Sequence, residues 1–393
     1  MRSPTGEVKA CASDDRPAAV VPGVVIAHSP ASSGRYIGSP SLAVLPGGDY
    51  VASHDFFGPE SGEFRRAQSA IYRSMDRGAT WRRIAEIDGA FWSTLFVHRG
   101  ALYLMGTDRH HGDVVIRRST DGGRSWTTPE NDRTGLLRGG GEYHGAPVPV
   151  LEHGGRIWRG FERRDPPVGW GVNYRAGMLS ADIDADLLCA VSWTAAGFMP
   201  SSREWNGGDM GGWLEGNAVA APDGRVLDIL RVETQLYPER AAVAEVSADG
   251  RAFLFDPERG FIDFPGGAKK FTIRFDPRSA LYWSVVTDAA EADRGAGRPT
   301  KVRNTLALTC SSDLRAWTTR RTLLRHPDVA RHGFQYVDWQ FDDRDIIAVC
   351  RTAYDDAEGG ARNHHDANYM TFHRIGDFRV PSPPPCKPRA PSL

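Results

Sequence analysis

The chain has 393 residues, 40% of them hydrophobic and 25% charged, and its 48 basic and 49 acidic residues leave a formal net charge of −1. A balance so close to neutral excludes a global field that would draw the protein to nucleic acid or to an anionic membrane. No run of 18 apolar residues occurs, which argues against a membrane span. We therefore expect neither a nucleic-acid partner nor a membrane-embedded segment.

The two ends of the chain differ from its middle. Residues 1–20 lack the apolar stretch of a secretory signal, and residues 379–393 are rich in proline, which removes the backbone donors that a sheet needs. We expect both ends to be disordered and residues 21–378 to form a single domain. The sequence as written predicts a cytoplasmic protein, whereas a leader upstream of it would mean export.

A strand–turn–strand pattern recurs six times in the middle of the chain, over residues 42–53, 94–106, 148–161, 218–230, 272–285 and 338–350. Its second strands, aligned on Tyr50, Tyr103, Trp158, Leu227, Tyr282 and Ile347, are 53, 55, 69, 55 and 65 residues apart. A further hairpin fits between successive copies, which gives four strands per unit. The 43 glycines and 26 prolines supply the many turns that such a chain needs.

Six four-stranded antiparallel units predict an all-β, six-bladed β-propeller, with seven blades as the alternative, because radial closure leaves few exposed sheet edges. The segment 24–27 is expected to pair near residues 369–372 and so to close the ring.

A short turn motif marks the third-to-fourth strand connection. Residues 74–81 (SMDRGATW) and 119–126 (STDGGRSW) share the pattern S-x-D-x-G-x-x-W, known as the Asp-box, and residues 247–250 and 311–317 hold weaker copies. The Asp carboxylate is expected to accept backbone N–H groups within the turn, and the Trp to pack between sheets. The motif is a fold signal, since the turn is a structural element and not a site.

Cysteine usage points away from metal knuckles and disulfide frameworks. The five cysteines are widely spaced, no CxxC pair occurs, and their number is odd: Cys11, Cys189, Cys310, Cys350 and Cys386. Buried free thiols are the expected state. No cofactor is expected to be required.

Residues that precede the first strand of each unit, or follow its second strand, share one rim of a propeller. This rule collects polar and aromatic side chains there, including His54, Asp55, Trp92, Tyr143, His144, Glu162, Trp213, Glu215, Arg231, Lys269, Lys270, Tyr336 and Arg351. Arginine binds carboxylates bidentately and flat rings suit sugar faces, so the rim predicts a site for an acidic sugar. Its binding residues would be Asp55, Glu162, Trp213, Arg231 and Arg351. The alternative is that these groups only satisfy one another around the central channel.

The segment after Arg351 is dense in Asp, Asn and His. Asp355, Asp356 and Asp366 are candidate ligands of a structural divalent cation such as Ca²⁺. A loop that bonds to itself explains the same residues, because Asp and Asn cap turns. His110 and His111 are expected on a solvated hairpin tip.

Across nearly its whole length the chain resembles the Asp-box sialidase-like superfamily. Sialidases of that group carry Y-R-I-P-S at the first inner strand, three arginines for the substrate carboxylate, and a Tyr nucleophile paired with a Glu. The corresponding stretch here, residues 35–41 (RYIGSPS), keeps Pro-Ser and lacks the Arg before Ile-Pro. The resemblance implies carboxylate contacts from Arg231 and Arg351, and a nucleophile pair of Tyr336 and Glu215.

The rim that carries His54 is more similar to propeller lyases and rhamnosidases that act beside uronic acids. That resemblance implies His54, Tyr143 and His144 as proton-transfer groups, with arginine neutralising the uronate so that its C5 proton can be abstracted.

Three functions therefore compete. The first is a carbohydrate-active enzyme, a polysaccharide lyase or glycoside hydrolase, that cleaves a linkage next to a uronate-type sugar. The second is a sialidase-type exo-glycosidase, and the third is a non-catalytic glycan-binding propeller, since a fold does not dictate an activity. An oligo- or polysaccharide is the expected partner in all three.

Overall fold

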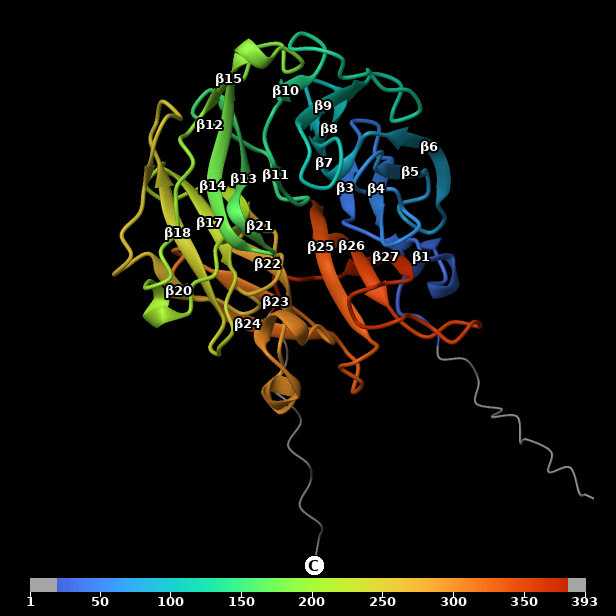
Figure 1. Cartoon of the computed structure of the whole chain (residues 1–393). Coiled ribbons are helices and arrows are strands. Elements are labelled where there is room, and N and C mark those ends of the chain that lie inside the picture. The colour runs from blue at the N-terminus through green and yellow to red at the C-terminus, as the bar shows by residue number, and fades with distance from the viewer. Residues whose placement is uncertain (1–19, 381–393) are drawn as a thin grey trace, which may run out of the picture.

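The structure, a computed structural model, describes residues 20–380, apart from the side chains of residues 167 and 168. Six antiparallel sheets surround a common centre in that part of the chain (Figure 1), which confirms the six-bladed propeller. The ends predicted to be disordered lie outside the described residues except for Val20, Arg379 and Val380, so their disorder stays a prediction.

The first three blades follow one another along the chain. Blade 1 consists of β2 (Tyr36–Ile37), β3 (Ser41–Val44), β4 (Tyr50–Phe57), β5 (Gln68–Ser74) and β6 (Arg82–Asp88). Blade 2 consists of β7 (Phe91–His98), β8 (Ala101–Thr107), β9 (Val114–Ser119) and β10 (Leu136–Arg138). Blade 3 consists of β11 (Tyr143–His144), β12 (Leu151–His153), β13 (Arg156–Gly169), β14 (Val172–Asp182) and β15 (Trp193–Ala195).

The remaining blades complete the ring. Blade 4 consists of β16 (Trp213–Ala220), β17 (Val226–Val232), β18 (Arg240–Val246), β19 (Phe253–Leu254) and β20 (Phe261–Asp263). Blade 5 consists of β21 (Ile273–Asp276), β22 (Leu281–Asp288), β23 (Thr305–Ser311) and β24 (Thr318–Arg325). Blade 6 consists of β25 (Gly333–Asp342), β26 (Asp345–Ala353), β27 (Tyr369–Ile375) and, from the other end of the chain, β1 (Val24–His28).

Blade 6 closes the ring as the sequence predicted. Strand β1 runs antiparallel to β27, with Val24 opposite Phe372 and His28 opposite Tyr369, and the two strands lie together in Figure 1. A strand from each end of the domain thus completes one sheet, so that opening the ring requires breaking a ladder of backbone hydrogen bonds.

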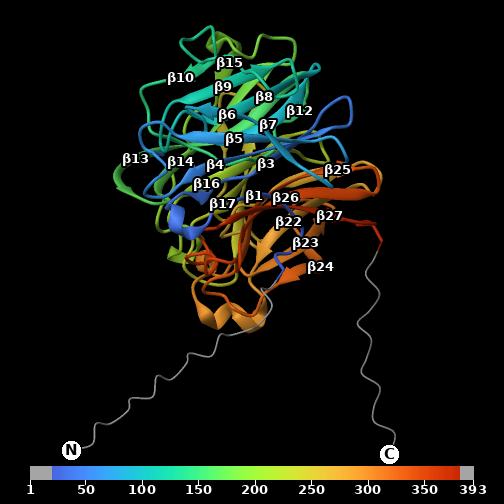
Figure 2. The same cartoon turned by 90° about the vertical axis from the view of Figure 1, so that its right-hand side faces the viewer.

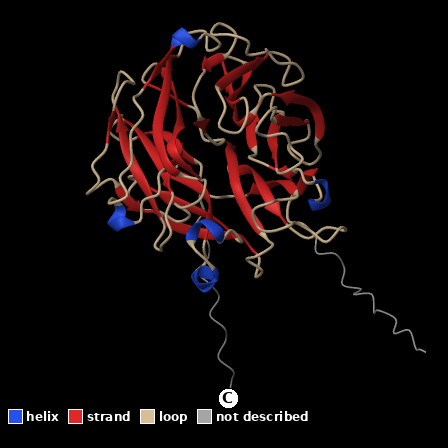
Figure 3. Ribbon diagram, in the orientation of Figure 1, coloured by secondary structure: helices blue, strands red, loops and turns tan. Residues whose placement is uncertain are grey.

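Helices are few, as Figure 3 shows. Those in the described part of the chain are five short 3₁₀ turns: η1 (Ala31–Ser33), η2 (Ala190–Ser192), η3 (Asn206–Gly208), η4 (Glu291–Ala296) and η5 (Pro299–Lys301). None of the helices within residues 20–380 has the length and apolarity to cross a membrane.

The turns between third and fourth strands show the hydrogen bonds expected of them. In the β5–β6 turn, Asp76 accepts from the backbone N–H and the hydroxyl of Thr80, and Trp81 packs against Phe372 of blade 6 at 5.6 Å between ring centroids. Asp121 accepts the same two kinds of bond from Ser125 in blade 2. These carboxylates tie their turns together, and the Trp joins neighbouring blades.

The free cysteines are only partly as predicted. Cys310 and Cys350 are buried thiols, whereas Cys189 is half-buried. Cys11 and Cys386 lie outside the described residues.

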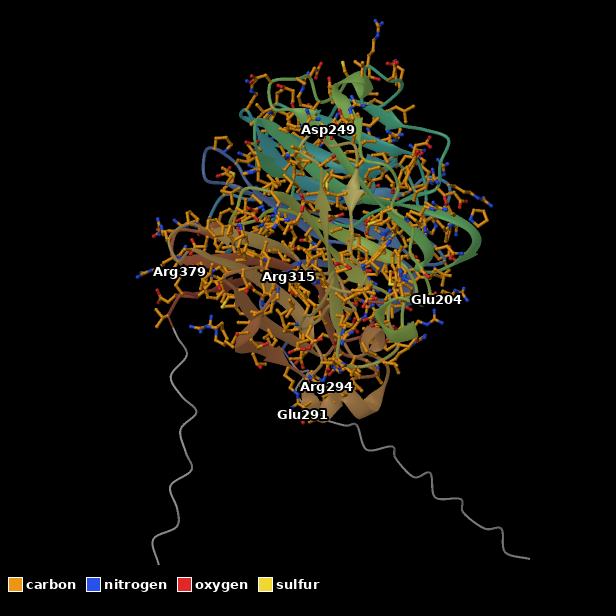
Figure 4. The ribbon with its side chains drawn as sticks, turned by 90° about the vertical axis from the view of Figure 1, so that its left-hand side faces the viewer. Glu204, Asp249, Glu291, Arg294, Arg315 and Arg379 are labelled. Atoms are coloured by element: carbon orange, nitrogen blue, oxygen red, sulfur yellow. The ribbon has the colours of Figure 1, made fainter. Side chains whose placement is uncertain are left out.

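Strand register separates the two faces of the propeller. Tyr50 pairs with Ser74 next to the Asp76 turn, whereas Asp55 pairs with Ser69 at the far end of the same strands. The second-to-third strand connections therefore lie on the face opposite the Asp76-type turns. In Figure 4, Glu204, in the loop before β16, and Arg379, which bonds to Asp276 at the end of β21, lie on opposite sides of the molecule.

Candidate functional site

A cavity of about 600 Å³ lies where all six blades meet, on the face that carries the second-to-third strand connections. Its walls include Asp55 of blade 1, Trp92 of blade 2, Arg231 of blade 4, Arg303 of blade 5 and Tyr336 of blade 6. We call it the central cavity. A cavity of about 640 Å³ lined by residues of the opposite hairpins lacks such a cluster of charges.

Three inner strands carry the same local distortion at the end that faces the central cavity. The ladders of β7, β16 and β25 slip at a bulge, and one residue of each bulge has a left-handed backbone: Trp92 (φ 50°), Glu215 (φ 53°) and Tyr336 (φ 54°). Bulges re-aim side chains, and non-glycine residues with positive φ persist where the surroundings enforce them. The repeated bulge thus sets the directions of three side chains at or beneath the cavity.

Three buried arginines gather around the ring of Tyr336. The Arg351 guanidinium lies 4.9 Å from the ring centroid and that of Arg303 lies 5.8 Å from it. Arg231 donates to Glu215 at 3.0 Å and to Glu233 at 3.2 Å. Burial alone lowers the pKa of Arg231, but these carboxylates raise it above its ordinary value.

For the other two guanidiniums, nearby carboxylates only partly offset the effect of burial on the pKa. Arg303 donates to the carbonyl of Thr300 and to the side-chain oxygen of Gln335, and Arg351 donates to the carbonyl of His365. Within residues 20–380 neither forms an ion pair, although the residues are only 5% and 4% exposed. Burial lowers the pKa of Arg351 to about 10 and that of Arg303 in the same direction, so both stay charged at neutral pH.

Tyr336 and Glu215 are electrostatically coupled beneath these arginines. Burial raises the pKa of the Tyr336 phenol, and the charge of Glu215 adds to this effect, while the arginines oppose it. The phenol is therefore protonated at neutral pH. Oε1 of Glu215 is buried and has no hydrogen-bond partner among the described residues, so this oxygen is available to accept a proton.

Asp55 lies in another wall of the central cavity. Its two oxygens accept the backbone N–H groups of Ser39 and Trp92, each at 2.6 Å. Burial raises the pKa of Asp55 to about 6, although the two hydrogen bonds lower it. A carboxyl group with this pKa can donate a proton near neutral pH and accept one back.

Of the residues predicted from the sequence, Asp55, Arg231, Tyr336 and Arg351 line the central cavity, and Glu215 contacts Arg231 beside it. His54, Tyr143, His144, Glu162 and Trp213 do not line it.

The two histidines in that second group are held by other partners. His54 bonds to the carbonyl of Asp55 and stacks on Tyr72, and burial lowers its pKa to about 4, so it is neutral. His144 bonds to Glu162 at 2.7 Å.

The remaining three are bound into the interior. Glu162 also accepts from the backbone of Gly216 in blade 4. Tyr143 and Trp213 belong to hydrophobic cores. These positions do not test the catalytic roles predicted for His54, Tyr143 and His144 or the binding roles predicted for Glu162 and Trp213.

The candidate cation ligands have protein partners, some in their own loop and some outside it. Asp356 accepts from His28, Asn368 and two backbone N–H groups, and Asp366 accepts from His365 and Asn363. Asp355 lies 3.5 Å from a ring nitrogen of His332. Among residues 20–380 no group of three or more His, Cys, Asp and Glu side chains is arranged to hold a metal, and a cation at this loop stays a prediction.

Sequence reasoning missed Arg303, Glu63, His110 and Trp170, which also line the cavity. Arg303 precedes the third strand of blade 5, and a third strand begins on the face where the second ends. The position of Arg303 in the sequence therefore indicated that this residue lies on the face of the cavity. His110, expected on a solvated tip, instead stacks on Phe64 and Phe91 and contacts the ring of Trp92, because the β8–β9 connection folds over the cavity.

No protein-family model matches the chain, and no curated protein matches it either. Solved structures do. The fold is one that sialidases and an arabinanase share. A Hadza microbial sialidase has a TM-score of 0.60 at 13% identity, over 90% of this chain and 68% of that one.

Two further structures were solved with sugars bound. Trypanosoma rangeli sialidase in complex with sialic acid has a TM-score of 0.58 at 14% identity, over 87% of this chain and 54% of the other. Penicillium chrysogenum α-L-arabinanase complexed with arabinobiose has a TM-score of 0.57 at 13% identity, over 91% and 98%. At these identities the likeness concerns the fold alone.

Proposed function

We propose that the protein is a glycoside hydrolase that releases an acidic sugar from a glycan, with Tyr336 as nucleophile. The observation that carries the proposal is the pair of buried guanidiniums, Arg303 and Arg351, neither of which forms an ion pair with a carboxylate among residues 20–380. Buried charges are costly unless they are paired. A substrate carboxylate supplies the missing charge, with Arg231 as a third contact.

The chemistry follows from the protonation states. Tyr336 attacks the anomeric carbon while its phenol proton passes to Glu215, and Asp55 protonates the leaving oxygen as the glycosidic bond breaks. The products are a covalent aryl glycoside, in which the tyrosine oxygen is bonded to the anomeric carbon, and a free alcohol. Water then attacks the same carbon, Asp55 takes its proton, and Tyr336 recovers its own from Glu215. The raised pKa of Tyr336 explains why a base such as Glu215 is needed.

The similar structures support a sugar substrate without deciding which one. Two are sialidases and one is an arabinanase. Arabinobiose carries no carboxylate, so the unpaired arginines favour an acidic sugar of the sialic acid or uronic acid kind.

A panel of fluorogenic glycosides tests the proposal. It contains N-acetylneuraminic acid, its deaminated analogue, glucuronic acid and galacturonic acid, with α-L-arabinofuranose as the neutral member. We expect turnover of at least one acidic glycoside and none of the neutral one. An activated fluoro sugar of the substrate should add its glycosyl mass to the peptide that contains Tyr336. Turnover of the arabinofuranoside alone would contradict the proposal.

The elimination hypothesis has weaker support. A uronate would suit the same arginines, but its proton-transfer groups His54 and His144 do not line the cavity and have other partners. An unsaturated uronate product, detected by its ultraviolet absorbance, would favour elimination. Binding of acidic glycans without any product would favour a non-catalytic propeller.

A further inference from the structure

Aromatic side chains gather at one end of the central cavity. His110 lies at its centre, with the rings of Phe64, Trp92 and Trp170 at 4.5, 4.7 and 6.0 Å between centroids. Phe64 is 64% exposed and Trp170 is 45% exposed, whereas Trp92 is buried. We call Phe64, His110 and Trp170 the aromatic rim.

The aromatic rim comes from three separate connections. Phe64 lies in the loop between β4 and β5, His110 between β8 and β9, and Trp170 at the tip of the β13–β14 hairpin. This long hairpin extends beyond the blades in Figure 2. Large exposed aromatic groups are costly in water, and their grouping beside a cavity is typical of a binding surface.

A buried carboxylate with a free oxygen lies in the same place. Glu63 lines the central cavity, is 8% exposed, and its Oε2 has no hydrogen-bond partner among residues 20–380. Its Oε1 lies 3.6 Å from Nδ1 of His110, and the backbone N–H of His110 donates to its carbonyl at 2.9 Å. An orphaned acceptor of this kind calls for a donor from a ligand.

The aromatic rim lies on the side of Asp55. The backbone N–H of Trp92, whose ring contacts His110 and Trp170, donates to the Asp55 carboxylate. The arginines that bind the substrate carboxylate surround Tyr336. A group protonated by Asp55 as it leaves would therefore depart along Trp92 toward the aromatic rim.

We propose that the aromatic rim and Glu63 form a second sugar subsite, which binds the leaving-group sugar of the substrate. The sugar would stack a face on Trp170 or Phe64 and donate a hydroxyl to Oε2 of Glu63. An uncharged hexose or pentose fits, because a second acidic sugar would be repelled by Glu63. The substrate is then an acidic sugar attached to a neutral one, and this substrate class rests on the proposed function.

Kinetics separate the subsite from a structural role. Two substrates share the acidic sugar found by the panel: in one it is linked to a neutral hexose, and in the other it is a glycosyl fluoride, whose leaving group cannot reach the rim. We expect Trp170→Ala to lower kcat/KM for the disaccharide about 5- to 10-fold and to leave the fluoride unchanged. Phe275→Ala is the matched control, since Phe275 is 46% exposed and lines the cavity on the opposite face. Equal effects of Trp170→Ala on both substrates would overturn the proposal.

Direct binding tests the subsite without turnover. Saturation-transfer NMR with a panel of methyl glycosides of neutral hexoses and pentoses should give a signal for at least one of them in the unaltered protein. The signal should persist in Phe275→Ala and disappear in the double variant Phe64→Ala/Trp170→Ala. A signal from no member of the panel, or one that survives in the double variant, would refute the subsite. Binding without turnover of any acidic glycoside would refute only the proposed hydrolase activity.

Discussion

The pKa of Asp55 makes a quantitative prediction about activity and pH. With a pKa of about 6, the acid form falls from about 90% at pH 5 to about 1% at pH 8. If this form protonates the leaving oxygen, kcat/KM should fall about 90-fold over that interval for a substrate with a poor leaving group. The sign follows from burial, which disfavours the charged carboxylate and so extends the acid form to higher pH than in an exposed aspartate.

The assay compares two substrates of one acidic sugar between pH 4.5 and 8.5. For the alkyl glycoside, kcat/KM should fall above pH 6. For the glycosyl fluoride it should not, because the fluoride ion leaves without being protonated. Glu63→Gln offers a second perturbation, because the charge of Glu63 helps to raise the pKa of Asp55 and its loss should move the fall to lower pH. A flat profile for the alkyl glycoside, or the same fall in Asp55→Asn, would refute the assignment of Asp55 as the acid.

Three further outcomes are expected. Glu215→Gln should lower kcat about 10²- to 10⁴-fold with little change in KM, because the phenol of Tyr336 loses its base. A variant with a raised KM and an unchanged kcat would contradict this. Arg351→Lys should raise KM for the acidic substrate about 10- to 100-fold, since lysine cannot bind a carboxylate bidentately, and should not affect the substrate methyl ester; equal losses on both would point to misfolding. Asp228→Asn should stabilise the protein at alkaline pH. Burial raises the pKa of Asp228 well above its ordinary value, and neither of its oxygens has a hydrogen-bond partner among the described residues. The unaltered protein therefore loses stability as the pH rises through that pKa, and the variant should not. Thermal unfolding at pH 5 and pH 9 measures this, and an unchanged pH slope in the variant would contradict it.

The fold was predictable because its signals are local and repeated. Six strand–turn–strand copies and the Asp76 and Asp121 turns specify four-stranded blades, and the segment 24–27 had only one open edge to join. The broken inner strand of blade 3, where β11 and β12 replace one strand, was not visible in the pattern. It explains why the rule that located Tyr336 at the cavity was wrong for Tyr143, which belongs to a hydrophobic core.

The site was predictable only in part because neighbouring residues of a strand point to opposite sides. Asp55 lines the cavity and His54 does not, yet both follow Tyr50, the residue on which the blade 1 copy is aligned, at the expected distance. Bulges shift this alternation by one residue, as at Tyr336, and no residue type in the sequence predicted where they occur. Arg303 was missed because the rule considered only residues before first strands and after second strands, whereas Arg303 comes directly before the third strand, β23.

The missing arginine of the sialidase pattern leads to a last prediction. Aligning Pro40-Ser41 with the Pro-Ser of that pattern puts Gly38 where the pattern has Arg. A Cβ at Gly38 would lie 1.6 Å from Oδ1 of Asp55 and 2.7 Å from its carbonyl oxygen, so the position tolerates no side chain while Asp55 keeps its two backbone hydrogen bonds. The third guanidinium comes instead from Arg351 in the neighbouring blade 6 and lies 4.3 Å from the ring centroid of Phe57 in blade 1.

Gly38→Ala should therefore impair proton donation by Asp55 and leave binding of the substrate carboxylate unchanged. We expect it to lower kcat/KM about 10²- to 10⁴-fold for an alkyl glycoside, to affect the glycosyl fluoride far less, and to leave KM for the fluoride unchanged. Gly47→Ala is the matched control, because a Cβ there meets nothing within 4 Å. A Gly38→Ala variant that keeps full activity on the alkyl glycoside would show that Asp55 does not need the position in which the fold holds it, and the catalytic assignment would then have to move to another carboxylate of the cavity.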